Sequence, residues 1–323
     1  MRIAVACLVS ALLLCSGQKV RADDYPSRPI KLVLPQPAGG AVDLIARALG
    51  DRLSQQMRAS VVVENMPGAN GSLAAGSVAR AAPDGYTLML AVDSNLVINP
   101  SLYHNLTYDS FSDFAPISII ARLYVVLVTN PEVAAHDVRE LIAYAKAHPN
   151  KLNYASIGLG TAMHMSMELF KFMTGTQINQ VSYRGTAQAM TDVVAGTVDL
   201  MFTGPPSAKS MSAGGKLRVL AVASPERMAL LPDVPTMEEA GVPGYEMMSW
   251  FGLLAPAKTP HNIVERLSRE VDTAVHDPKF GEHMKEQGLE TVGSTPAAML
   301  ATMRSDSEKW SALIKATGIT VPQ

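Results

Sequence analysis

Short apolar runs alternate along this chain with longer segments in which apolar residues recur every three or four positions. The run at 30–34 is followed by residues 41–57, whose apolar side chains fall at helical spacing. The same order returns with a strand at 61–63, a helix through 74–78 and a third strand over 86–92. Repeated strand–helix units predict an α/β fold with a mostly parallel sheet.

A second series of the same kind begins near residue 124, so two sheets are the simplest arrangement. Its expected strands and the helices between them lie at 125–128, 138–147, 152–155, 163–173, 179–181, 187–195, 200–202 and 217–223. A helical tail follows, at 263–275, 279–287 and 296–317, and is expected to return to the first half. We therefore predict lobe 1 from residues 23–123 and 251–323 and lobe 2 from residues 124–250, joined by crossing strands, since no flexible linker is visible.

The first 22 residues differ from the rest and are expected to be a secretory signal peptide. Arg2 precedes an apolar run over 3–14, a polar stretch follows, and Ala22 ends a small-residue cleavage site. The apolar run is shorter than the roughly 20 residues that span a bilayer. Both cysteines, Cys7 and Cys15, fall inside this segment, with lipidation of Cys15 as a weaker alternative. The mature protein is thus expected in the periplasm without a disulfide or a thiol nucleophile.

Charge excludes one class of partner. Loss of residues 1–22 removes three of the 27 basic residues and none of the 29 acidic ones, which leaves a net charge of −5. A mildly acidic chain without a basic run lacks the electrostatic footprint of a nucleic-acid-binding protein. Any anionic ligand must therefore be held by a local site.

The first candidate for such a site is the Pro/Gly-rich turn between the strand at 30–34 and the helix at 41–57. Uncovered amide groups at a helix N-terminus attract anions, and ligands of open α/β sheets bind at the carboxyl ends of strands. The spacing matches neither a P-loop nor a dinucleotide fingerprint, and an ordinary connecting turn is the alternative. The candidate residues in this turn are Gln36, Pro37, Ala38, Gly39, Gly40 and Asp43.

A second turn, in the other half, has the same order of strand, small residues and helix, so the two could face each other across a cleft. Thr161 is placed to cap the helix that follows, and capping alone is the alternative reading. Its candidates are Ser156, Gly158, Gly160, Thr161 and His164.

Single residues at other strand ends complete the candidate set. Arg184 is the cation best placed for a second carboxylate, because a guanidinium binds carboxylates through two parallel hydrogen bonds. Ser94, Asn95 and Thr203 also follow expected strands. Each has an ordinary alternative, as a solvated arginine or as turn chemistry.

No catalytic or metal-binding constellation stands out. Ser156 lacks the glycine two positions earlier that a nucleophile elbow needs, and the seven histidines show no zinc-ligand spacing. We therefore expect neither catalytic residues nor a metal or cofactor. A sensor that binds its ligand for signalling remains open, as does, more remotely, an enzyme acting on a small carboxylate.

Many ordered blocks of the chain resemble one family, the extracytoplasmic solute receptors of tripartite tricarboxylate transporters, called Bug receptors. The resemblance covers nearly the whole mature chain and is carried by YPSRPI at 25–30, the Pro/Gly turn, VENMPGA at 63–69, APDGYTL at 82–88, INPSLY at 98–103, DFAP at 113–116, LNYAS at 152–156, LPDVPT at 231–236 and SWFGLLAP at 249–256.

The resemblance implies a type II periplasmic binding-protein fold whose two lobes close on a carboxylate held by the two Gly-containing turns. It also implies a monomer that delivers its ligand to membrane transporter subunits. Gln36, Ala38, Ala41 and Val42 depart from the family's usual first turn, and Thr203-Gly204 stands where many members have an Asp suited to an amino group. We therefore expect a ligand without an amine, most simply a dicarboxylate, aliphatic or aromatic.

Overall fold

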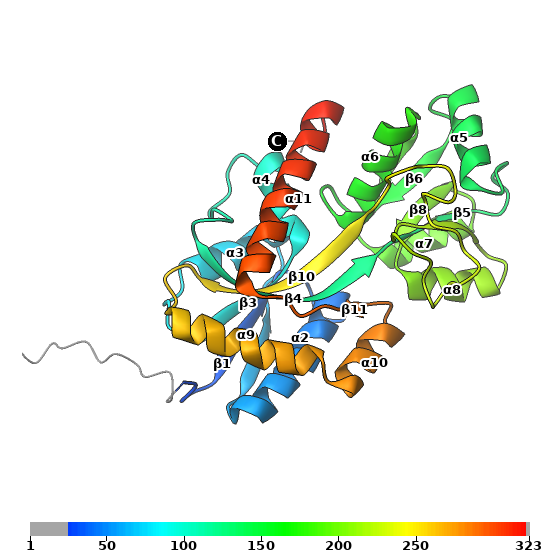
Figure 1. The fold of residues 1–323 in the computed structure, drawn as a ribbon. Helices are drawn as coiled ribbons and strands as arrows, with labels where there is room; N and C mark the ends of the chain where they lie inside the picture. Colours follow the sequence, from blue (N-terminus) through cyan, green and yellow to red (C-terminus); the bar gives the residue numbers. More distant parts are fainter. Residues whose placement is uncertain (1–24, 321–323) are drawn as a thin grey trace, which may run out of the picture.

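The computed structural model describes residues 25–320, which form an α/β structure with two sheets in two lobes (Figure 1). The expected signal peptide, residues 1–22, lies outside the described residues. Lobe 1 is built on a six-stranded sheet in the order β11-β4-β10-β3-β1-β2. Its strands are β1 (Ile30–Leu34), β2 (Val61–Asn65), β3 (Thr87–Val92), β4 (Phe114–Tyr124), β10 (Met248–Pro256) and β11 (Glu290–Thr291).

Helices cover both faces of this sheet. Alternate β1 side chains, Ile30, Leu32 and Leu34, join a core cluster with buried residues of α2 and α9, while Val33 packs into a cluster on the other side. The helical elements of lobe 1 are α2 (Ala41–Met57), the short η2 (Ala69–Gly71), α3 (Ser72–Ala79), the π-helical turn η3 (Ser94–Ile98), α4 (Asn99–Leu102), α9 (His261–Val275), α10 (Pro278–Glu286) and α11 (Pro296–Thr317).

Lobe 2 has a five-stranded sheet in the order β7-β6-β8-β5-β9. Its strands are β5 (Val126–Thr129), β6 (Asn153–Ser156), β7 (Asn179–Ser182), β8 (Leu200–Thr203) and β9 (Arg218–Val222). Its helices are α5 (Val138–Ala147), α6 (Ala162–Thr174), α7 (Thr186–Val194) and α8 (Pro205–Ala213). Strands β7, β6 and β8 are parallel, so the first turns of α6, α7 and α8 gather at one edge of the sheet.

Two antiparallel strands connect the lobes. Strand β4 runs from the lobe 1 sheet almost directly into β5, with Val125 between them, and β10 returns beside β4 from the Tyr124–Met248 pair onward. On β10, Trp250 donates its indole N–H to Asp306 of α11 at 2.7 Å, which ties the hinge strand to the C-terminal helix. The lobes are therefore joined by a pair of antiparallel strands, and their action as a hinge stays a prediction.

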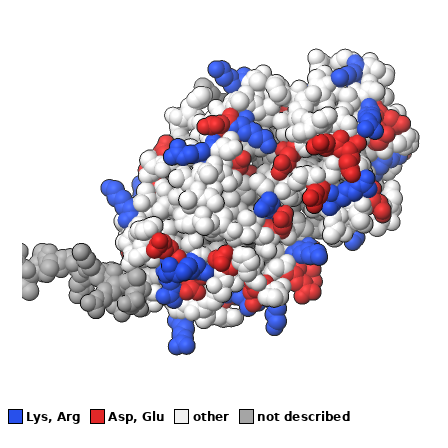
Figure 2. Space-filling model, viewed as in Figure 1, with Lys and Arg blue, Asp and Glu red and all other residues white. Residues whose placement is uncertain are grey.

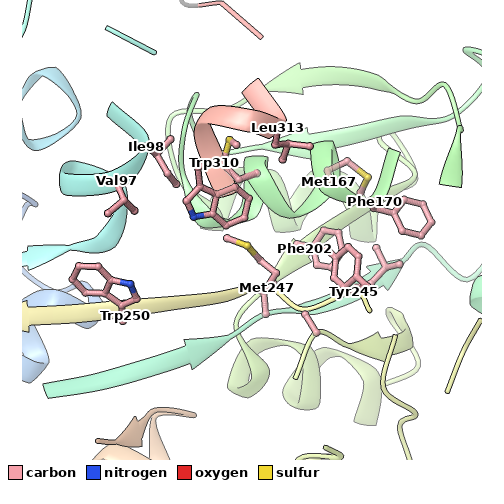
Figure 3. Close-up of a cluster of buried hydrophobic side chains, with 14 of the residues drawn as sticks. Val97, Ile98, Met167, Phe170, Phe202, Tyr245, Met247, Trp250, Trp310 and Leu313 are labelled. Atoms are coloured by element: carbon pink, nitrogen blue, oxygen red, sulfur yellow. The ribbon is translucent and has the colours of Figure 1, made fainter. Parts of the chain in front are cut away.

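The C-terminal helix also joins the hydrophobic interiors of the two lobes. Trp310 and Leu313 of α11 belong to one buried cluster with Ile98 of lobe 1 and with Met167 and Phe202 of lobe 2 (Figure 3). Separation of the lobes at this point would expose apolar surface.

The sheets are less parallel than the pattern predicted. Strand β10 is antiparallel to both β3 and β4, and β5 is antiparallel to both β8 and β9. The antiparallel pairs all involve the strands that cross or adjoin the hinge, where the chain reverses direction between lobes. No helix within residues 25–320 is both long and apolar enough to cross a membrane.

Candidate functional site

Strand ends of the two lobes face each other. In lobe 1 the parallel strands β1, β2 and β3 end at residues 34, 65 and 92, so the turns that follow lie at one edge. A methyl group added to Gly160 in lobe 2 would lie 2.8 Å from Leu102 Cδ1 and 3.5 Å from Asn70 Nδ2 of lobe 1. The lobes are thus in contact beside their strand ends, close to the second candidate turn. A ligand cleft between the two turns stays a prediction.

Within the first turn, Gln36 to Gly40 are exposed and Asp43 is buried. Asp43 does not face outward for a ligand: it accepts the Gly39 amide at 3.0 Å and two hydrogen bonds from Arg47 at 2.9 and 3.0 Å. These bonds, led by those from Arg47, lower the pKa of Asp43 to about 2. Asp43 therefore positions the turn, and the Gly39 amide that the sequence suggested for the ligand is used internally.

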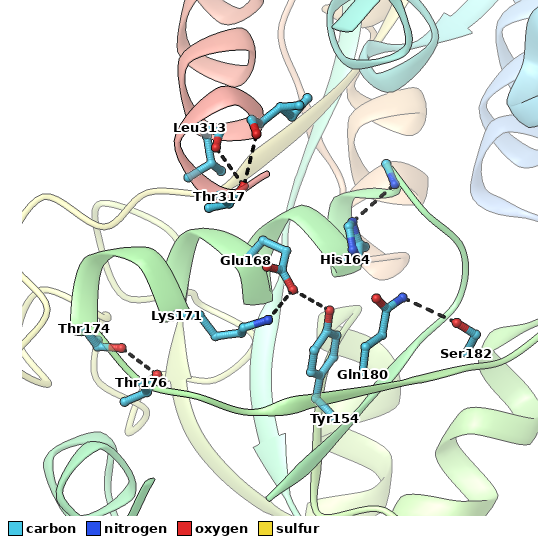
Figure 4. A network of polar contacts seen from close by, with 12 residues as sticks. Tyr154, His164, Glu168, Lys171, Thr174, Thr176, Gln180, Ser182, Leu313 and Thr317 are labelled. Carbon is cyan, nitrogen blue, oxygen red and sulfur yellow. Dashed lines mark hydrogen bonds and ion pairs between the residues drawn. The ribbon is translucent and has the colours of Figure 1, made fainter. Parts of the chain in front are cut away.

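The second turn is also held from within. Thr161 caps α6 by accepting the His164 amide, as predicted, and donates its hydroxyl to the Gly158 carbonyl at 2.8 Å. The Gly160 amide donates to Nδ1 of buried His164 at 3.3 Å (Figure 4). Burial lowers the pKa of His164, so the ring is neutral and can accept this bond. His164 thus stabilises the turn by accepting the Gly160 amide.

A polar network buried in lobe 2 fixes the helix behind this turn. Glu168 of α6 accepts hydrogen bonds from the Tyr154 hydroxyl and from Lys171 Nζ, both at 2.7 Å (Figure 4). Strand β6 and helix α6 are therefore locked together on either side of the turn that they flank.

Ser94 and Asn95 are buried in the π-helical turn η3, and the Asn95 side chain binds the protein itself. The Asn95 side chain accepts the Val92 amide at 3.1 Å and donates to the Asn70 carbonyl at 2.8 Å. Asp93, which caps η3, accepts a hydrogen bond from Ser249 of the hinge strand at 2.7 Å, while its other oxygen has no partner among the described residues. Burial raises the pKa of Asp93 to about 7.

Free hydrogen-bonding capacity remains at the helix N-termini. Gly40, Gly185 and Gly204 are the N-caps of α2, α7 and α8, and none of them has a side-chain hydrogen bond. The first two residues of α8, Pro205 and Pro206, have no amide N–H, so only α2 and α7 offer a full first turn of amides. An uncapped first turn leaves amide groups for a ligand and the positive end of the helix dipole. Exposed Arg184 directly precedes the α7 cap.

Two buried hydroxyls lie at the ends of lobe 2 strands. Ser156 closes β6 and Thr203 closes β8, and neither hydroxyl has a hydrogen-bond partner among residues 25–320. An unsatisfied buried hydroxyl is costly, so such groups often serve a ligand or a bound water.

Residues 68–71 were not among the sequence candidates. Gly68, Ala69, Asn70 and Gly71 all have positive φ, from 46° to 140°, which is unfavourable for Ala69 and Asn70. The turn touches Pro35 on one side and approaches Gly160 on the other. The Asn70-Gly71 pair, which is typical of turns, was the sequence signal that could have pointed to this segment.

The fold and the opposed strand ends define a two-lobed ligand-binding protein. The sequence profile of the tripartite tricarboxylate transporter family receptors matches residues 45–319, and the chain belongs to that family.

Relatives and solved structures agree with this assignment. The chain is 34% identical to Protein BugT of Bordetella pertussis over 300 residues, 93% of this chain and 92% of that one. It resembles the structure of Rpa4515 of R. palustris with adipate, with a TM-score of 0.83, 36% identity and coverage of 92% and 99% of the two chains. It also resembles MatC of Rhodopseudomonas palustris with bound malate, with a TM-score of 0.79, 29% identity and coverage of 90% and 100%.

These findings confirm the predicted α/β, two-lobed binding-protein fold and the Bug-type family. The family and its structural neighbours are solute-binding receptors.

Proposed function

We propose that this chain captures a small dicarboxylate, aliphatic or aromatic, by closure of its lobes in the periplasm and delivers it to the membrane subunits of a tripartite transporter. The observation that carries the proposal is a pair of uncapped helix N-termini, that of α2 in lobe 1 and that of α7 in lobe 2, each of which follows the carboxyl end of a parallel strand. Secretion through residues 1–22 and action as a monomer complete the proposal.

The magnitudes are sufficient without any catalytic group. Hydrogen bonds to a charged group contribute about 1.5–3 kcal/mol each, so a handful of amides supports micromolar affinity, about −8 kcal/mol, after ordering costs. Each uncapped helix adds the attraction of its dipole for a carboxylate. A ligand with two separated carboxylates can place one at each helix N-terminus, whereas a monocarboxylate can occupy only one of them.

Three further features support a dicarboxylate. Arg184 precedes the N-terminus of α7 and supplies a cation for the distal carboxylate. Thr203-Gly204 offers no acid for an amino group. The solved structures of two relatives contain adipate and malate, both dicarboxylates.

A thermal-shift panel followed by calorimetry tests the proposal. Adipate, malate and phthalate are compared with hexanoate, which lacks the second carboxylate of adipate, and with glutamate, which adds an amine. A ligand at 100 times its Kd adds about 2.7 kcal/mol to the free energy of unfolding. We expect the dicarboxylates to stabilise most; a larger shift with glutamate, or turnover of any of these compounds, would contradict the proposal.

The role of Arg184 is tested with one substitution. Arg184→Ala is expected to weaken adipate binding at least tenfold while hexanoate binding changes little. Equal losses for the two ligands would show that Arg184 does not hold the distal carboxylate.

A further inference from the structure

A groove between the lobes is lined by none of the site residues that the sequence predicted. It has a volume of about 720 Å³, within the range of small-molecule sites. One wall comes from β4, α10 and β11 of lobe 1, and the other from residues 224–230 of lobe 2, which follow β9. Gly288 forms part of its rim and packs against Pro205 and Pro206 at the start of α8, so this contact lies between the groove and the N-terminus of α8.

Charged side chains from both lobes line the groove, and they include the acidic Glu226 and Glu290 as well as three basic residues. Arg122 on β4, Lys285 on α10 and Arg227 on the lobe 2 wall are among them. Arg122 lies 3.8 Å from its acidic neighbour Glu290 and also interacts with the Tyr124 hydroxyl, but a guanidinium has five N–H donors, so part of it stays available. Arg227, in contrast, is engaged by Glu239 at 2.9 Å. Arg122 and Lys285 are therefore the cations available to an anion.

The remaining surface of the groove is mainly apolar. Leu289 is 4% exposed at its base, and Pro225, Met228 and Leu230 extend the apolar wall on lobe 2. An apolar cavity with a few convergent charged groups selects a ligand with an apolar body and one charged end. Surface charges of both signs are interspersed over the face in Figure 2, so a local pair of cations, not a general basic field, would orient such a ligand.

We propose that this groove is a second binding site, for an organic anion with an apolar body, and that its occupancy is coupled to the angle between the lobes. Tyr124, the last residue of β4, lines the groove at the hinge itself. Rotation about the hinge changes the distance between the two walls, so a ligand that fits one distance favours one lobe angle. A ligand in the groove therefore changes the affinity of the proposed dicarboxylate site for its own ligand. By thermodynamic linkage, the dicarboxylate changes the affinity of the groove by the same factor.

The probe for this site is 4-iodobenzoate, which has one carboxylate, an apolar ring and an iodine atom with anomalous scattering. A crystal soaked with it should show iodine density between the walls of the groove. Arg122→Gln with Lys285→Gln should weaken its binding at least tenfold in calorimetry. Lys279→Gln, on the same helix outside the groove, is the matched control and should leave the affinity unchanged.

Iodine density in the cleft alone, or equal affinity in the double variant and the control, would overturn the proposed site. The coupling rests on the proposed function and has its own measurement: the Kd of 4-iodobenzoate with and without saturating adipate. An unchanged Kd when adipate binds would refute the coupling but leave the site. Failure of adipate to bind would count against the proposed dicarboxylate function alone.

Discussion

The contact between Gly160 and lobe 1 provides a direct test of lobe closure. Gly160 has φ +75°, and an added methyl group would lie 2.8 Å from Leu102 Cδ1 and 3.4 Å from Ile98 Cγ2. Gly160→Ala therefore introduces two costs. Backbone strain of about 1–2 kcal/mol applies whether the lobes are open or closed. The clash applies only when the lobes are in contact.

The second cost can be estimated from the packing distance. Carbon atoms pack best at about 3.5–4.0 Å, so the lobes must separate by roughly 1 Å at this point or repack. Overpacking of this kind costs about 1–3 kcal/mol. Because this cost falls on the closed state alone, we expect ligand affinity to fall about 5- to 150-fold, at about 1.4 kcal/mol per factor of ten.

Gly175→Ala is the matched control, since Gly175 has φ +65° and an added methyl group would meet nothing within 4 Å. Urea denaturation should show similar losses of stability for the two variants, and calorimetry with adipate should show a loss of affinity for Gly160→Ala only. Equal adipate affinities would refute the reasoning, because they would mean that this contact is not part of the ligand-bound state.

Three further predictions concern positioning and stability. With a pKa near 7 when folded and about 3.9 when unfolded, Asp93 binds more protons in the folded state, so stability should fall by up to about 4 kcal/mol as pH rises from 4 to 7. Asp93→Asn should flatten that slope in urea titrations at pH 5 and 8; an unchanged slope would contradict it. Gly288→Ala, whose methyl group would lie 2.8 Å from Pro206 Cδ, should weaken adipate binding as Gly160→Ala does, and unchanged binding would exclude this second contact from closure. Asp43→Asn should loosen the Gly39 turn and weaken adipate binding. In the wild type the pKa of Asp43, about 2, keeps this carboxylate ionised, so its titration should not change adipate binding between pH 5 and 8. Calorimetry at both pH values checks this.

The local pattern of apolar and polar residues was enough to predict the individual strands, helices and turns of the fold. The apolar runs and helical spacings placed most strands and helices, and the strand–turn–helix order located the turns at 36–40 and 158–161, because these features depend on neighbours in sequence. Thr161 was assigned as a helix cap from its position, and the structure confirms it.

The direction of the hinge strands and the use of each polar group depend on residues far apart in the chain. Strand β10 pairs with β4 across more than a hundred residues, and no local pattern sets that pairing. Gly39 and Gly160 were expected to offer their amides to a ligand, yet Asp43 and His164 accept them. A sequence shows which donors exist, but only the folded chain determines which of them are already satisfied, because a buried donor takes whatever acceptor the packing brings within reach.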